Sequence, residues 1–218
     1  DAFAVDSQKK AVAAIAAGHF KSQIVPVDVK TRKGVVAFDT DEHPKADTTL
    51  ETLAKLKPAF KKDGGTVTAG NASGLNDAAA ACVLMEAGAA ERAGLARLAR
   101  LVSYAICGVD NAIMGTGPIP AVQLALKRAG LSLDDIDVIE SNEAFAAQSL
   151  GVCRGLDLDP ARTNPNGGAI ALGHPLGATG SILTVKCVYE LIRTNKRYGL
   201  ITMCIGGGQG IAAIVERP

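Results

Sequence analysis

The alternation of strand-like and helix-like segments after residue 98 constrains the fold more than any other feature of this chain. Valine- and isoleucine-rich segments typical of strands lie at residues 99–107, 136–141 and 198–218, the last divided by a glycine turn at 205–210. Segments with helical periodicity lie between them, at 120–130, 145–156 and 181–193. Strands that alternate with helices predict an α/β unit in which helices cover a sheet.

The first part of the chain lacks an obvious core of its own. We expect a helix over residues 4–17 that ends at Gly18, strands at 23–30 and 34–40 joined by a polar turn, and a short helix capped near 47–49 and closed by Pro58. This region therefore predicts an excursion that serves another part of the molecule.

Residues 66–94 differ sharply in composition. A short strand and a turn of small residues are followed by a run of Ala, Cys, Val, Leu and Met. A helix that is apolar on nearly all sides is normally buried. We therefore expect a buried helix here, lying between two sheets.

Charge and cysteine usage exclude several classes of function. Lys and Arg number 23 against 22 Asp and Glu, and no basic stripe occurs, which argues against nucleic acid as a partner. The apolar runs are shorter than the roughly 20 residues of a membrane span, and we expect no signal peptide. The five cysteines have no zinc-like or disulfide-like spacing, which indicates reduced thiols.

The stretch from residue 164 to 180 contains His174 between Gly173 and Pro175 and predicts a tight, uncharged loop that opens a helix. Histidine titrates near neutrality and can act as base, acid or hydrogen-bond donor. Glycines allow a ligand to approach the backbone, and a helix N-terminus favours an anion. The alternative is a surface turn with an ordinary histidine.

Two further stretches follow predicted strands, where α/β folds place their sites. Cys204 precedes three glycines whose N–H groups could hold a developing oxyanion, although a buried structural cysteine is the commoner outcome. A phosphate loop would need a Lys-Ser/Thr ending that is absent. Asn142 and Glu143 begin a predicted helix, so they could simply cap it.

Five ordered motifs carry a family resemblance: NASGLND (71–77), MGTGPIPA (114–121), NEAFAAQ (142–148), NGGAIALGHPLGATG (166–180) and CIGGGQG (204–210). The chain resembles the thiolases, specifically the bacterial biosynthetic type. The resemblance implies the five-layer αβαβα thiolase fold, of which this chain supplies the carboxy-terminal half. It also implies that residues 1–74 belong to the CoA-binding loop domain, 75–97 complete the amino-terminal domain with the buried helix, and 98–218 form the carboxy-terminal domain.

The resemblance implies a role for each matching residue. His174 would activate the nucleophile and, with a water held by Asn142, form an oxyanion hole. Cys204 would be the acid/base, and the N–H of Gly206 would serve a second oxyanion hole. The pantetheine tunnel and the nucleotide end of CoA would be contacted by Ser73, Ala69, Phe145, Met114, His43 and Lys45.

The implied activity is reversible Claisen condensation of two CoA thioesters, acetyl-CoA with acetyl-CoA or acyl-CoA, to acetoacetyl-CoA or another 3-ketoacyl-CoA. No metal and no cofactor beyond CoA is implied. The implied setting is cytoplasmic, in polyhydroxyalkanoate biosynthesis or fatty acid metabolism, with a homotetramer built as a dimer of dimers.

The family's acylated cysteine matches none of Cys82, Cys107, Cys153 or Cys187. A companion amino-terminal half bearing that nucleophile is therefore expected. Two alternatives remain: a condensing enzyme like the ketoacyl-carrier-protein synthases, and a non-catalytic CoA- or lipid-binding protein on the same scaffold.

Overall fold

The computed structural model describes residues 1–218, and its centre is a four-stranded mixed sheet. The strands are β3 (Arg100–Gly108), β4 (Val138–Ser141), β5 (Tyr198–Ile205) and β6 (Gln209–Glu216), in the order β3-β6-β5-β4. β5 runs parallel to β4, and β6 is antiparallel to both β5 and β3. The predicted α/β unit in the second half of the chain is confirmed.

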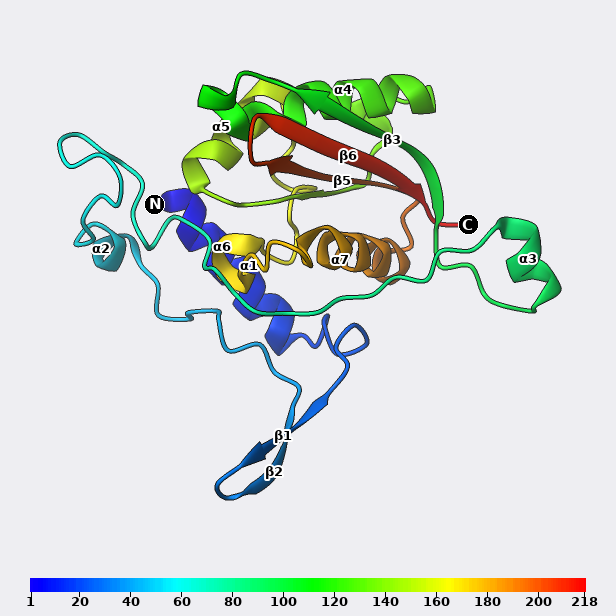
Figure 1. Cartoon of the computed structure of the whole chain (residues 1–218), viewed down its shortest axis with the longest axis horizontal. Coiled ribbons are helices and arrows are strands. Elements are labelled where there is room, and N and C mark those ends of the chain that lie inside the picture. Colours follow the sequence, from blue (N-terminus) through cyan, green and yellow to red (C-terminus); the bar gives the residue numbers. More distant parts are fainter.

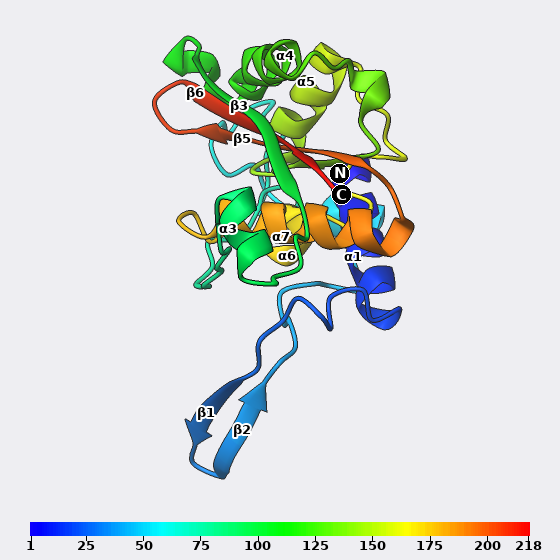
Figure 2. The same cartoon turned by 90° about the vertical axis from the view of Figure 1, so that its right-hand side faces the viewer.

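Helices cover both faces of this sheet (Figures 1 and 2). α4 (Pro118–Ala129) and α5 (Ala146–Leu156) lie on one face, and α7 (Thr179–Thr194) packs on the other. Successive strand residues alternate between the two faces: Leu200 faces the α4 and α5 layer, whereas Ile201 faces α7. The chain therefore supplies a helix–sheet–helix sandwich, three of the five expected layers.

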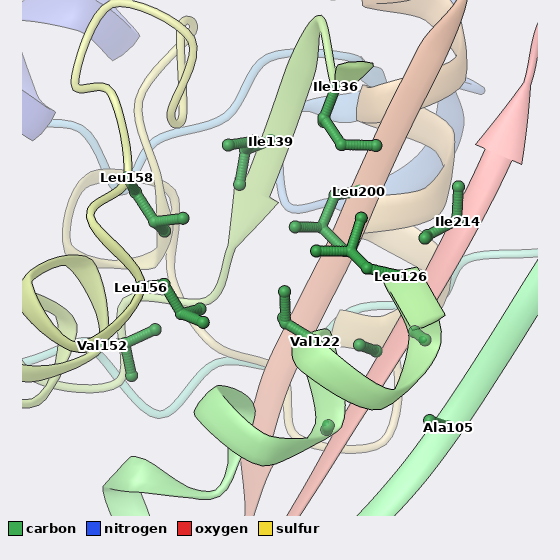
Figure 3. Packing of buried hydrophobic residues seen from close by; sticks show 13 residues of the cluster. Ala105, Val122, Leu126, Ile136, Ile139, Val152, Leu156, Leu158, Leu200 and Ile214 are labelled. Atoms are coloured by element: carbon green, nitrogen blue, oxygen red, sulfur yellow. The ribbon is translucent and has the colours of Figure 1, made fainter. Parts of the chain in front are cut away.

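The larger core lies between the sheet and α4 and α5 (Figure 3). Ile136, Val122, Leu200 and Ile214 are completely buried there. Fully burying such a side chain contributes about 1.5–3 kcal/mol relative to leaving it exposed. This core fixes the carboxyl ends of β4 and β5, where the predicted site residues begin.

Local sequence sets the helix boundaries. Pro118 occupies the first turn of α4, where its missing N–H costs nothing, and Gly130 ends the helix in the left-handed conformation at φ 67°. α7 ends in the same way at Asn195, with φ 55°. Short 3₁₀ turns at η1 (Asn111–Thr116) and η2 (Leu133–Asp135) connect the larger elements.

The first part of the chain forms separate elements. α1 (Ala2–Ala16) and α6 (Ala169–Leu172) pack together near α7, and a hairpin of β1 (Val27–Thr31) and β2 (Gly34–Phe38) projects away from the sandwich (Figures 1 and 2). α2 (Leu50–Leu53) begins at a capping box formed by Thr49 and Thr52. The expected helix, hairpin strands and capped turn are confirmed. No helix is both long and apolar enough to span a membrane.

The predicted buried helix within residues 75–97 is wrong. Residues 77–86 form no helix, and α3 (Ala87–Arg92) is a short helix in which only Ala90 is buried. Val83 and Leu84 are 89% and 85% exposed. An isolated helix of this length is marginal in water, and no other element of the chain packs around these side chains. The expected strand near residue 66 is reduced to a single bridge between Pro58 and Thr68.

Candidate active site

His174 lies in a buried setting that fixes the orientation of its ring. Its backbone N–H donates to the carbonyl oxygen of Gly74 at 3.1 Å and to Oδ1 of Asn76 at 3.2 Å. The residue is 8% exposed, and Gly173 before it takes φ 88°, a conformation that favours glycine. The alternative of an ordinary surface histidine is therefore wrong.

Two hydrogen bonds decide which ring nitrogen of His174 carries the proton. Nδ1 lies 2.7 Å from Oγ1 of Thr179, and the Thr179 hydroxyl donates to the carbonyl oxygen of Pro175 at 3.1 Å. Because that hydroxyl has one proton, it accepts from Nδ1–H. Nε2 is then the unprotonated nitrogen, and burial lowers the pKa of His174 below its ordinary value. The neutral ring presents a basic nitrogen.

That basic nitrogen faces Asn142. Asn142 extends β4 by donating its N–H to the carbonyl oxygen of Thr202 at 2.9 Å, and its side chain is 1% exposed. Its Nδ2 lies 3.4 Å from Nε2 of His174, and its Oδ1 is buried without a partner. An unpaired buried oxygen is a free acceptor, consistent with a polar ligand or water at this position.

The alternative that Asn142 and Glu143 only cap a helix is wrong. α5 begins at Ala146 with Phe145 as its N-cap residue, and no side chain caps it. The Glu143 carboxylate instead accepts hydrogen bonds from Ser7, Asn164 and the Ile170 backbone. Both side chains are turned into the protein interior.

Cys204 lies near the carboxyl end of β5, two residues beyond Thr202 and opposite Gly210 of β6. It is 7% exposed, and burial raises the pKa of its thiol. The ring of His174 bonds to Thr179 and Asn142 rather than to Cys204. A thiolate at Cys204 therefore needs additional stabilisation, which bound substrate and backbone N–H groups could provide.

The three glycines after Cys204 form the turn between β5 and β6. Gly206 is exposed, and Gly207 and Gly208 take φ 85° and 89°. Gly210, which follows this turn, packs against the backbone of Gly117. A side chain on Gly210 would overlap the backbone of Gly117, and a side chain on Gly117 would overlap the backbone of residues 209 and 210. The glycines thus allow the MGTGP and CIGGGQG motifs to approach each other closely.

Residues expected to contact CoA fall into two groups. Ser73 donates its N–H to the carbonyl oxygen of Ala144, and Phe145 bridges to Ala72, so these two lie together beside the NEAF turn. Met114 is half-buried in η1, which contacts α5, and Ala69 is exposed in a turn.

The other two expected CoA contacts differ from each other. Nδ1 of His43 lies 2.8 Å from the carbonyl oxygen of Ala171, so its ring is attached to the histidine loop rather than solvated. Lys45 is exposed, and its hydrogen bonds come from its backbone: the N–H donates to Oε1 of Gln8, and the carbonyl oxygen accepts from Thr48. Nowhere in the chain do three or more His, Cys, Asp or Glu side chains gather in a way that could hold a metal ion.

The structure gives roles to residues to which the sequence analysis assigned none. Thr179 and Asn76 hold His174, and a buried ion pair of 2.7 Å joins Lys186 of α7 to Glu140 of β4. Lys186 also donates to the carbonyl oxygen of Gly167 in the histidine loop. Thr179 lies only five residues from His174, but Asn76 is 98 residues away, and Lys186 and Glu140 are 46 residues apart, so local spacing does not reveal the latter contacts.

Comparison with known proteins settles the family. The thiolase C-terminal domain model matches residues 95–217, and the thiolase N-terminal domain model matches residues 1–88. The chain belongs to the thiolase family. It is 63% identical over 217 residues to the beta-ketothiolase BktB of Cupriavidus necator, and 57% identical over 217 residues to the acetyl-CoA acetyltransferase of Escherichia coli. Each match covers all of this chain and 55% of the relative.

Solved thiolase structures confirm the expected fold. The acetyl-CoA acetyltransferase of Bacillus anthracis superposes with a TM-score of 0.97 at 50% identity, covering 100% of this chain and 55% of that one. A human mitochondrial 3-ketoacyl-CoA thiolase in complex with CoA superposes with a TM-score of 0.92 at 49% identity, covering 100% and 54%. This thiolase chain therefore spans about half the length of the relatives that it matches.

Proposed function

We propose that this chain supplies one part of an acyl-CoA:acetyl-CoA C-acyltransferase, which catalyses the reversible condensation of acetyl-CoA with a second CoA thioester. The observation that carries the proposal is the pair of His174 and Asn142 at the carboxyl end of β4, with a basic Nε2 facing a buried amide. The relatives named above are thiolases, which favours this function over a carrier-protein synthase or a non-catalytic binder.

In the proposed mechanism, Nε2 of His174 takes the proton of the nucleophilic thiol, and the thiolate attacks the first CoA thioester and expels CoA as a thiolate that solvent protonates. The imidazolium N–H, together with a water held by Asn142, then stabilises the enolate oxygen of acetyl-CoA. The enolate attacks the acyl-enzyme carbonyl, and the expelled nucleophile takes its proton back from His174. Preorganised donors of this kind contribute about 3 kcal/mol each to the transition state. The hydrogen bond from Nδ1–H to Thr179 supports this role, because it leaves Nε2 as the nitrogen that exchanges the proton.

Cys204 would be the second acid/base. Its thiolate removes the α-proton of acetyl-CoA in synthesis, and its thiol returns a proton in cleavage. Burial raises the pKa of the free thiol, so deprotonation is expected to depend on the substrate-bound site. The N–H of Gly206 would hold the oxygen of the acyl-enzyme carbonyl, as an exposed turn residue two positions beyond Cys204.

CoA is the proposed ligand. Ser73 and Phe145 lie side by side at the NEAF turn, which supports a pantetheine contact there, with Met114 and Ala69 as further lining residues. His43 and Lys45 are proposed at the nucleotide end. Because this chain spans about 55% of its relatives, we propose that the acylated cysteine comes from the remaining length of the complete enzyme.

The domain boundaries at 74 and 97, the homotetramer, the cytoplasmic location and a place in polyhydroxyalkanoate or fatty acid metabolism stay predictions.

A Cys204→Ala variant of the complete enzyme tests the proposal. Acylation of the nucleophile by acetyl-CoA should persist, whereas condensation should fall at least 100-fold, because only the second step needs this base. Cys187→Ala, which removes a buried thiol from the α7 core, is the matched control. Condensation that survives in Cys204→Ala would contradict the assignment of Cys204.

A further inference from the structure

Glu143 is a buried carboxylate that joins three separate segments. It follows Asn142 directly and is 2% exposed. Its Oε2 accepts from Oγ of Ser7 in α1 at 2.6 Å and from the N–H of Ile170 in α6 at 3.2 Å. Its Oε1 accepts from Nδ2 of Asn164, at the start of the histidine loop, at 2.8 Å.

Every partner of this carboxylate donates a hydrogen bond to it. Oγ of Ser7 already accepts from the N–H of Gly168, and Oδ1 of Asn164 already accepts from the N–H of Ser141. A group surrounded only by donors must be an acceptor on both of its oxygens, which an ionised carboxylate is and an amide is not. The position therefore requires glutamate rather than its isosteric amide.

Two of the three hydrogen-bond partners, Asn164 and Ile170, lie on the segment that carries His174. Asn164 begins that segment, Gly168 packs against the Glu143 carboxylate where a side chain would overlap it, and Ile170 lies four residues before His174. The Ile170 peptide is held from its other side as well, because its carbonyl oxygen accepts from Nε2 of Gln8 at 3.3 Å. The segment is thus fastened to both α1 and the NEAF turn.

We propose that Glu143 is a positioning residue that sets His174 against Asn142 by clamping the loop of residues 164–173. This inference rests on the proposed function for its catalytic consequence. Glu143 touches neither reacting atom in the mechanism above. It acts through Asn164 and Ile170, which determine where the imidazole lies relative to the amide of the preceding residue.

The test compares Glu143→Gln with Glu190→Gln in the complete enzyme. Glu190 is the matched control, because it is also buried and also holds this loop, but at Asn166 and without contact to the NEAF turn. We expect Glu143→Gln to lower kcat for condensation about 10- to 100-fold with the KM for acetyl-CoA within about twofold, since misplacement of a catalytic group costs rate rather than binding. Glu190→Gln should lower kcat less than about threefold.

Imidazole NMR signals provide a readout that a merely structural role would not produce. The chain has three histidines, and His19 bonds to Asn166, the partner of Glu190. Glu143→Gln should therefore shift the signal of His174 and leave that of His19, whereas Glu190→Gln should do the reverse. If both variants move the same signals, or if folded Glu143→Gln keeps kcat within twofold of the wild type, the proposal is overturned.

A milder variant keeps the proposal testable if Glu143→Gln folds poorly. Ser7→Ala, which removes one donor to Glu143 and the acceptor of the Gly168 N–H, should lower kcat about fivefold; an unchanged kcat would overturn the clamp. A wild-type enzyme without condensation activity would instead refute the proposed function, while the NMR comparison would still decide the positioning role.

Discussion

Removing the Thr179 hydroxyl tests whether its hydrogen bond fixes the tautomer of His174. Thr179 is 2% exposed and accepts from Nδ1–H of His174 at 2.7 Å. In Thr179→Val the side chain keeps its shape, but the buried Nδ1–H loses its acceptor. An unsatisfied buried donor costs about 1–3 kcal/mol, which disfavours the tautomer with Nε2 as the base.

That cost corresponds to a fall in condensation rate of about 5- to 150-fold, since about 1.4 kcal/mol is a factor of ten. The assay is kcat for condensation and for acetoacetyl-CoA cleavage by the complete enzyme, on protein shown to be folded by its thermal transition. Both directions should slow equally, because the same imidazole serves both.

Thr184→Val provides the control. The hydroxyl of Thr184 donates to the carbonyl oxygen of Gly180 at 2.8 Å, just as that of Thr179 donates to Pro175, but it makes no contact with His174. Thr184→Val should therefore retain activity within about twofold. The reasoning is refuted if the folded Thr179→Val enzyme is as active as Thr184→Val.

Two further predictions concern protonation and the buried ion pair. Burial lowers the pKa of His174 below its ordinary value of 6.5, so its neutral, basic form persists as pH falls through that value. The loss of condensation rate that is caused by protonation of His174 should therefore lie below pH 6.5. A pH–rate profile that already declines above 6.5 through protonation of His174 would contradict this. Lys186→Met leaves Glu140 buried without its partner and should lower the free energy of unfolding by about 3–5 kcal/mol in denaturant titration. Much of this loss should be recovered in Lys186→Met/Glu140→Leu. Equal losses in the single and double variants would show that the uncompensated charge is not the cause.

Much of the fold follows from patterns that extend over a few residues. The strands at the carboxyl end were predictable because alternate residues face opposite helix layers, as Leu200 and Ile201 do. The end of α4 was predictable because Gly130 has a conformation that ends a helix, whereas the helix begins at Pro118, two residues before the predicted segment 120–130. These features depend on local chemistry, which the sequence contains directly.

The errors arose where distant contacts decide the outcome. Residues 77–86 have the composition of a buried helix, but burial needs a partner surface, and within this chain Val83 and Leu84 face solvent. Glu143 has a favourable position for a helix cap, yet Ser7, 136 residues away, takes its carboxylate into the interior. Thr179 lay within a recognised motif, but only the folded loop brings its hydroxyl to Nδ1 of His174.

The most direct test of the account is CoA-dependent cleavage of acetoacetyl-CoA by this chain joined to the remaining length of the enzyme, compared with His174→Asn in the same background. We predict cleavage to acetyl-CoA in the first and a loss of at least 100-fold in the second, because the substitution removes the basic nitrogen that faces Asn142. Equal cleavage by the two enzymes would contradict the central claim that His174 and Asn142 form the catalytic site.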